Sequence, residues 1–182
     1  MKPVSNLNYF YLVAFSNPKC NRAIYKTIAK NKATSILEIG LGDATRAEKI
    51  VRIAKRYSGS GAVRYTGVDG FESQPHQKIT LKECHQKLQD PDVKLQLVPG
   101  EIYSSLNRIA NSHMRTDIVI ISAGYDPQAL VDSWFYMPRM LHATSKVFVQ
   151  PHDDEMGSFE VLSRLEIERK VKSQPRIMSR AA

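Results

Sequence analysis

The sequence predicts an α/β fold in which a doubly wound, mainly parallel β-sheet carries helices on both faces. Short apolar runs alternate along the chain with segments whose apolar residues recur at helical spacing. The run Ile118–Ile121 is apolar at every position, which is typical of a strand buried on both faces of a parallel sheet. Such an alternation builds right-handed β-α-β units, so we expect a sheet covered on both sides.

The first elements follow from local pattern. A helix is predicted over Asn21–Lys30, ahead of a buried strand at Ser35–Ile39. Apolar residues then recur every three or four positions over Ala44–Tyr57, which predicts an amphipathic helix that ends at the Ser58–Gly61 run. The apolar run Tyr9–Phe15 is expected to be a docking segment or a buried helix rather than a signal peptide.

The rest of the chain repeats this alternation. The further predicted strands are Val63–Val68, Val93–Val98, Asp117–Ser122 and a run centred on Val147–Val149, and the helices between them cover Leu81–Leu88, Ile102–Ala110 and Pro127–Tyr136. After the fifth strand, Phe159, Val161, Leu165 and Ile167 fit a period of two, which favours a final strand over a helix.

Length and composition indicate a single domain without a membrane span, a zinc site or a disulfide framework. The 182 residues are expected to form one domain, with a helical segment at 1–34, a core at 35–152, and a strand and basic tail at 153–182. No apolar run is long enough for a membrane span. The two cysteines, Cys20 and Cys84, lack zinc or disulfide spacing, which favours a cytoplasmic location.

The net charge of +8 would suit a polyanion such as RNA. However, the basic residues are interspersed, and those between Arg46 and Arg56 mostly lie opposite the apolar stripe of their helix. Solvated helix faces and a loose basic tail are therefore the preferred explanation of the charge, and nucleic-acid binding is possible but not favoured.

A glycine turn follows the first strand, at Gly40-Leu41-Gly42. On its own, the turn would fit either a ligand site or a tight connection without a ligand. Glu38, just before it, would repel a pyrophosphate but suits an ammonium group, and Asp69 ends the second strand where a carboxylate can accept hydrogen bonds from ribose hydroxyls. Thr45 stands where a dinucleotide fingerprint needs glycine or alanine, so an NAD site is disfavoured.

Three segments give the chain a family resemblance. Glu38–Gly42, Gly67–Phe71 and Gly100-Glu101 resemble the first three motifs of the class I S-adenosylmethionine-dependent methyltransferases, which have a Rossmann-like fold, and the resemblance covers roughly residues 20–152. It implies that the glycine turn holds the methionine part of S-adenosyl-L-methionine, Asp69 the ribose and Glu101 the adenine. Ala44 replaces a glycine that is common in the family. The expected cofactor-binding residues are Glu38, Gly40, Gly42, Asp69, Gly70, Glu101 and Ser122.

The second half is similar to the small-molecule methyltransferases of this family, but polar residues expected after strands four and five are replaced. Ser122 replaces an aspartate of that family, Gly124-Tyr125 replaces its Asp-His pair, and Pro151-His152 replaces its Asp-Asp pair. The remaining candidates for catalysis are Tyr125, Asp126 and His152. If the alignment is shifted by two residues, Asp126, Asp153 and Asp154 could offer oxygen ligands to a metal. The preferred interpretation is a site without a metal.

The sequence therefore predicts a methyltransferase acting on a small molecule. The alternatives are a non-catalytic module of the same fold that binds the cofactor or a partner, and an RNA methyltransferase. About 30 residues follow the fifth strand, too few for a separate substrate domain, so the substrate pocket is expected to be shallow, completed by the N-terminal segment, or shared in a homodimer.

Overall fold

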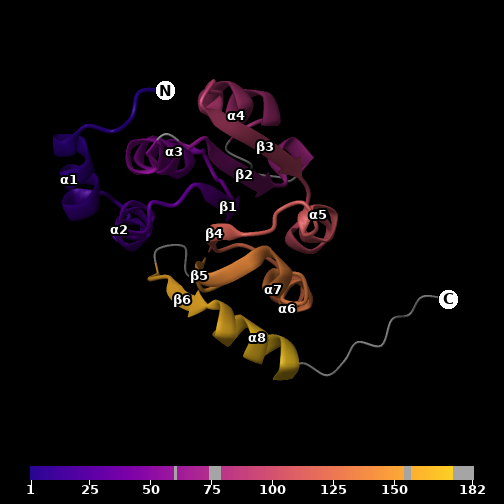
Figure 1. Cartoon of the computed structure of the whole chain (residues 1–182). Coiled ribbons are helices and arrows are strands. Elements are labelled where there is room, and N and C mark those ends of the chain that lie inside the picture. Colours follow the sequence, from indigo (N-terminus) through magenta and orange to yellow (C-terminus); the bar gives the residue numbers. More distant parts are fainter. Residues whose placement is uncertain (60, 74–78, 154–156, 174–182) are drawn as a thin grey trace.

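The computed structural model describes residues 1–59, 61–73, 79–153 and 157–173. Its centre is a six-stranded sheet in the order β3-β2-β1-β4-β5-β6 (Figure 1). The first five strands pair in parallel and only β6 runs antiparallel, against β5. This confirms the predicted doubly wound sheet. The strands are β1 (Ser35–Ile39), β2 (Val63–Asp69), β3 (Val93–Pro99), β4 (Thr116–Ile121), β5 (Leu141–Val149) and β6 (Glu160–Ser163).

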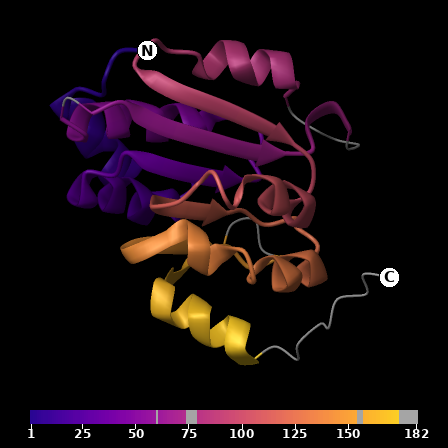
Figure 2. The same cartoon turned by 45° about the vertical axis from the view of Figure 1, so that its right-hand side comes forward.

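The strand order reverses between β1 and β4, which lie side by side in the middle of the sheet. Their register runs from Ile36 opposite Ile118 to Ile39 opposite Ile121. The arrowheads of β1 to β4 point to the same edge of the sheet (Figure 2). Connections leave the ends of β1 and β4 in different directions, so this edge holds the crevice in which open α/β sheets bind ligands.

Helices cover both faces of the sheet (Figure 1). On one face, buried residues of α2, α3 and α4 pack against Ile36, Tyr65 and Phe148, whereas α5, α6, α7 and α8 pack against Leu37 and Val119 on the other. The helices are α1 (Asn6–Phe15), α2 (Asn21–Asn31), α3 (Thr45–Tyr57), α4 (Leu81–Leu88), α5 (Ile102–Ile109), α6 (Pro127–Ser133), α7 (Met137–Met140) and α8 (Arg164–Ser173), and a 3₁₀ turn covers Phe71–Ser73.

The N-terminal apolar run is a helix, but it is not buried. None of the residues of α1 is buried, and Leu7, Phe10 and Phe15 are exposed. The helix contacts the rest of the fold along one side only, where the ring of Tyr9 meets that of Tyr57 at 5.0 Å between centroids. The buried-helix alternative was therefore wrong, and docking remains the prediction for this segment. No helix in the described ranges is both long and apolar enough to cross a membrane.

The C-terminal strand is shorter than predicted. β6 ends at Ser163, and the chain continues as α8, so the strand predicted through Leu165 and Ile167 is wrong there. The reason is a capping box: the carboxylate of Glu166 accepts hydrogen bonds from the Ser163 amide and hydroxyl, both at 2.6 Å. Ile167 is then buried against the sheet, while Leu165 is exposed. Three residues of the predicted basic tail, Arg169, Lys170 and Lys172, lie on α8, and the tail from residue 174 onward lies outside the described residues.

Several basic side chains of α3 form hydrogen bonds with the segment before α1 or with Asp90. Arg56 donates to the Val4 carbonyl at 2.8 Å, and Arg52 donates to the Lys2 carbonyl at 3.2 Å. Lys55, only 9% exposed, donates to Asp90 at 2.6 Å. The expectation of a solvated basic face was therefore wrong for Lys55, whereas Arg52 is still 33% exposed.

The Asp90 carboxylate should make stability depend on acid. Burial alone would raise its pKa, but hydrogen bonds from Lys55 and the Met1 amino group lower the pKa to about 2. An unfolded aspartate titrates near pH ~3.9, so the stabilisation is complete above that pH and is lost as the pH falls toward about 2. At pH 6, Asp90→Asn should lower the free energy of unfolding by about 1–2 kcal/mol.

Urea unfolding of both proteins at pH 6, 3.5 and 2.5 checks this expectation. The difference between wild type and variant should shrink at the lowest pH, where Asp90 is becoming protonated. A difference that stays constant across this range would contradict the assignment.

Candidate functional site

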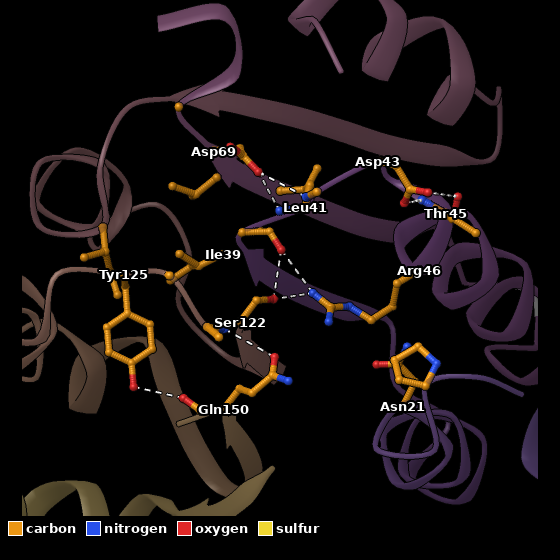
Figure 3. Close-up of a pocket in the computed structure, with 18 of the residues that line it drawn as sticks. Asn21, Ile39, Leu41, Asp43, Thr45, Arg46, Asp69, Ser122, Tyr125 and Gln150 are labelled. Atoms are coloured by element: carbon orange, nitrogen blue, oxygen red, sulfur yellow. Dashed lines mark hydrogen bonds between the residues drawn. The ribbon is translucent and has the colours of Figure 1, made fainter. Parts of the chain in front are cut away.

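A cavity of about 750 Å³ opens at the carboxyl edge of the sheet, where the strand order reverses. Its walls come from the turns that follow β1, β2, β3, β4 and β5, and from the beginning of α2 (Figure 3). The volume lies within the ~300–1,000 Å³ typical of small-molecule sites. The topology alone thus brings the predicted strand-end residues to one place.

The turn after β1 depends on glycine at two positions. Gly40 has φ +80°, and a Cβ there would lie 3.0 Å from the Cβ of Ser122 at the end of β4. Gly42 also has a positive φ, +61°, but open space around it. Ala44 also adopts a positive φ, +57°, so the turn is left-handed at a third position, which is not a glycine.

Asp69, at the end of β2, holds this turn in place through hydrogen bonds to its backbone. Its Oδ2 accepts hydrogen bonds from the amides of Leu41 at 2.6 Å and Gly42 at 3.3 Å, while Oδ1 has only a 3.4 Å contact with the Phe71 amide. Gly67 permits the close packing of this region, because a Cβ there would lie 2.7 Å from a methyl group of Leu41. Asp69 thus lines the cavity with one carboxylate oxygen largely unused.

Glu38 does not line the cavity, in contrast to the other predicted cofactor residues. Its side chain is fully buried. One oxygen accepts a hydrogen bond from Arg46 Nε at 2.7 Å, and the other accepts one from the Tyr65 hydroxyl. Burial, together with the adjacent Glu38 charge, raises the pKa of Tyr65, so the phenol keeps its proton and donates it. This carboxylate is therefore compensated from within the protein.

Arg46 is one of the residues of this site that the sequence did not predict, together with Asn21, Tyr25 and Lys49. Its Nη2 donates to the Gly40 carbonyl at 3.0 Å and to the Ser122 hydroxyl, which itself donates to the Gly40 carbonyl at 2.8 Å (Figure 3). The guanidinium thus joins the ends of β1 and β4. Burial lowers its pKa, but the charge and hydrogen bond of Glu38 outweigh this effect, so the pKa of Arg46 is raised overall.

The sequence offered only a weak signal for this role. Arg46 lies in the first turn of α3, where a cation is unfavourable to the helix dipole. A basic residue at that place needs a nearby anion, and Glu38 eight positions earlier is such an anion.

Two polar side chains of α2 face the same end of the cavity. Asn21 is 5% exposed and Tyr25 is 0% exposed, and both line the cavity. Within the described part of the chain, Asn21 Oδ1 and the Tyr25 hydroxyl have no hydrogen-bond partner. Lys49 of α3 also lines the cavity. At the opposite end, Glu101 precedes α5 with an exposed side chain that caps no helix.

The three catalytic candidates differ in their access to the cavity. Tyr125 lines it, but its hydroxyl donates to the Gln150 carbonyl at 2.9 Å, and burial raises its pKa. Asp126 also lines it and accepts hydrogen bonds from the first amides of α6. His152 is exposed, does not line the cavity, and lies against the Tyr125 ring at 5.6 Å between centroids.

The suggested metal ligands are not brought together in what the structure describes. Asp153 is exposed and does not line the cavity beside Asp126, and Asp154 lies outside the described residues. Across the described ranges, no group of three or more His, Cys, Asp or Glu side chains could hold a metal. The remaining predicted residues Gly70 and Ser122 do line the cavity.

Comparison with known proteins supports the fold. No protein-family model matches the chain. No curated protein matches its sequence. Among solved structures, a candidate rRNA methylase from Clostridium thermocellum is similar with a TM-score of 0.52 and 13% identity, over 84% of this chain and 74% of that one.

Two further structures agree with this result. The trans-methyltransferase CalH, in complex with SAH (S-adenosyl-L-homocysteine), has a TM-score of 0.51 and 16% identity, over 82% of this chain and 41% of that one. The methyltransferase domain of bacterial CtHen1-C has a TM-score of 0.50 and 15% identity, over 73% of this chain and 64% of that one. The chain thus spans less than two thirds of the length of these two proteins. Its fold is the Rossmann-like α/β fold of the class I methyltransferases.

Proposed function

We propose that this protein binds S-adenosyl-L-methionine and transfers its methyl group to a small molecule. The observation that carries the proposal is the charge arrangement of the cavity. Asp69 and Glu101 lie at the β2 and β3 end, whereas Arg46 and Lys49 lie together with Asp43 at the α2 and α3 end. A nucleoside joined to an amino acid has hydroxyl and amino donors at one end and ionised groups at the other, which suits these two ends.

The residues present fit this cofactor. Asp69 Oδ1 is available to accept from ribose hydroxyls, and Glu101 can accept from the adenine amino group. Gly40, Gly42 and Gly70 line the wall between these ends without side chains. A buried polar atom without a partner costs stability unless a ligand satisfies it, and Asn21 and Tyr25 supply two such atoms in the described residues.

The bound cofactor would supply an electrophilic methyl group, and the protein would mainly position the acceptor. Alignment of two reactants provides much of the rate of such a transfer. Asp126, at the β4 side of the cavity, is the candidate that can accept a proton from the acceptor. The Tyr125 hydroxyl donates a hydrogen bond to the Gln150 carbonyl, and its pKa is raised. Tyr125 is therefore suited to shape the cavity rather than to act as a base.

Cofactor binding without methyl transfer is the second candidate. It is favoured by Ser122, which stands where the related small-molecule enzymes have an aspartate and whose hydroxyl is engaged by Arg46 and the Gly40 carbonyl. Binding of SAH combined with no methyl transfer to any of a broad panel of small hydroxyl, thiol, amine and carboxylate compounds would favour this candidate.

Calorimetric titration with SAH tests the proposed binding. The wild type should bind, and Asp69→Asn should weaken binding about tenfold or more, because a hydrogen bond to a charged group contributes about 1.5–3 kcal/mol. Asp132→Asn, which removes the same charge on α6 outside the cavity, should bind like the wild type. Absence of binding to the wild type, or equal affinities of both variants, would contradict the proposal.

A further inference from the structure

We propose that the face of the protein formed by α1, together with the basic residues of α2 and α3 beside it, binds an anionic lipid surface. The side chains that enter the lipid are Leu7, Phe10, Tyr11 and Phe15, which form the α1 ridge. This interaction lies outside the cavity and goes beyond the proposed function, because it requires neither the cofactor nor methyl transfer.

The α1 ridge is apolar and open to solvent. Leu7 is 77% exposed, Phe10 62%, Tyr11 59% and Phe15 58%. These residues recur three or four positions apart, so they lie on one side of the helix, while Leu12 and Val13 on the other side pack against the core. α1 contains no charged residue. It lies outside the layer of α2 and α3, on the side away from the sheet (Figure 1). Such an exposed apolar patch marks an interaction surface.

The net charge of the protein is concentrated behind this ridge. Residues 1–57 contain eleven lysine and arginine residues and only three acidic residues, whereas the rest of the chain has fifteen of each kind. The whole charge of +8 therefore belongs to α1, α2, β1, α3 and the segments between them. A separation of this kind creates a positive potential over one side of a protein.

Basic residues border the α1 ridge on two sides. Lys26 and Lys30 of α2, the helix that packs beside α1, are exposed and lie four positions apart on one side of that helix. On the other side, Tyr11 lines a hollow of about 170 Å³ together with Lys49 and Arg52 of α3. The apolar side chains of the ridge thus stand between two groups of cations.

The acidic residues of this part of the chain do not cancel these charges. Glu38 is buried against Arg46, and Asp43 lines the cavity. Glu48 pairs with Arg52 at 3.6 Å, so it reduces the charge of that residue only. Among the described residues, the exposed lysines of α2 form no ion pair. Asp90 and Asp92, which follow α4, are both paired with Lys55 of α3.

An anionic lipid surface satisfies both features of this face. Its headgroups attract the cations, and the boundary with the acyl chains accepts leucine and aromatic side chains. A second copy of the chain would bring two faces of the same charge together. A nucleic acid would use the cations but would leave Leu7 in water. With ten residues, α1 has about half the length that spans a bilayer, so it lies in the plane of the headgroups.

The test is sedimentation of the purified full chain, without SAH, on vesicles of phosphatidylcholine alone or mixed equally with phosphatidylserine. Leu7→Gln/Phe10→Gln changes the ridge, and Lys26→Gln/Lys30→Gln removes two charges beside it. Leu165→Gln is the control for the first variant, because Leu165 is an exposed leucine of α8. Lys82→Gln/Lys172→Gln is the control for the second, since it removes two exposed lysines beyond residue 57. All four should unfold at about the wild-type temperature.

The wild type should bind the mixed vesicles and not those of phosphatidylcholine alone. Each of the two variants at this face should bind about tenfold more weakly or worse, because one loses buried apolar area and the other loses attraction to the headgroups. Both controls should bind as the wild type does. Raising the salt from about 0.1 M to about 1 M should weaken binding, since the Debye length falls from ~10 Å to ~3 Å.

A tryptophan placed on the ridge reports insertion directly and keeps the apolar character of α1. The single natural tryptophan, Trp134, is buried, so it gives a constant background. The emission of Phe10→Trp should shift to shorter wavelength on the mixed vesicles and should be quenched by brominated acyl chains. Leu165→Trp should show neither effect.

Three results would overturn the proposal. The first is a wild type that does not bind the mixed vesicles, including one whose ridge instead holds a dimer that Leu7→Gln/Phe10→Gln dissociates. The second is binding that the charge variant loses and the ridge variant keeps, with single-stranded RNA displacing the vesicles, which would assign the face to a nucleic acid. The third is an emission of Phe10→Trp that the vesicles leave unchanged. Since SAH is absent throughout, failure here leaves the proposed function intact.

Discussion

Arg46→Met is expected to lower the free energy of unfolding by about 3–5 kcal/mol, because it leaves the buried carboxylate of Glu38 without its counter-ion. Glu38 is 0% exposed and can gain no compensation from water. The Tyr65 hydroxyl would remain as a donor, but a neutral donor cannot balance the charge. Urea unfolding at pH 7.5 measures the loss.

A second substitution separates the ion pair from simple packing. Glu38→Gln in the Arg46→Met background removes the stranded charge and should recover a large part of the stability, since pairs in contact are strongly non-additive. Arg52→Met is the matched control on the same helix, where the side chain is 33% exposed and pairs with Glu48 at 3.6 Å. It should cost less than about 1 kcal/mol. Similar small losses in Arg46→Met and Arg52→Met would contradict the assignment of a buried ion pair.

Gly40→Ala is expected to lower the free energy of unfolding by about 2–4 kcal/mol and to abolish ligand binding. Two effects combine at this position. A left-handed backbone costs a residue with a Cβ about 1–2 kcal/mol. In addition, the new methyl group would lie 3.0 Å from the Cβ of Ser122, so the ends of β1 and β4 would have to separate where Arg46 joins them.

Gly42→Ala isolates the first of these effects. Gly42 also has a positive φ, but a Cβ there would meet no atom within 4 Å. This variant should lose only the backbone contribution, about 1–2 kcal/mol. Urea unfolding and SAH titration of both variants measure the difference. Equal losses would show that the approach of Ser122 to Gly40 does not constrain the turn.

Local sequence pattern was sufficient for most of the fold. The strands β1 to β4 and the helices between them follow the predicted ranges to within a residue or two, because burial on a sheet and on a helix imposes different periods on apolar residues. The C-terminal end was mispredicted because the four residues of β6 and the start of α8 share the same apolar alternation. There Ser163 and Glu166, three positions apart, provide the capping signal that ends the strand.

The candidate site was predictable only in part, for a related reason. Gly40, Gly42, Asp69, Gly70, Glu101 and Ser122 could be placed together, since each lies beside the carboxyl end of a parallel strand and those ends share one edge. Residues on helices lack this constraint. Periodicity shows which face of α3 is apolar, but it does not show that a long polar side chain at the start of that face turns back to the strand.

By itself, then, the sequence determined a doubly wound sheet with a glycine turn at its carboxyl edge and an acidic residue at the end of β2. Only the tertiary structure decided that Glu38 is a buried partner of other side chains and does not line the cavity. Its partners Arg46 and Tyr65 come from α3 and β2, and Ser122, which binds the same guanidinium, comes from β4. Which of several polar groups meet depends on how distant strands are ordered in the sheet, and a buried charge takes the partner that this order brings within hydrogen-bond distance.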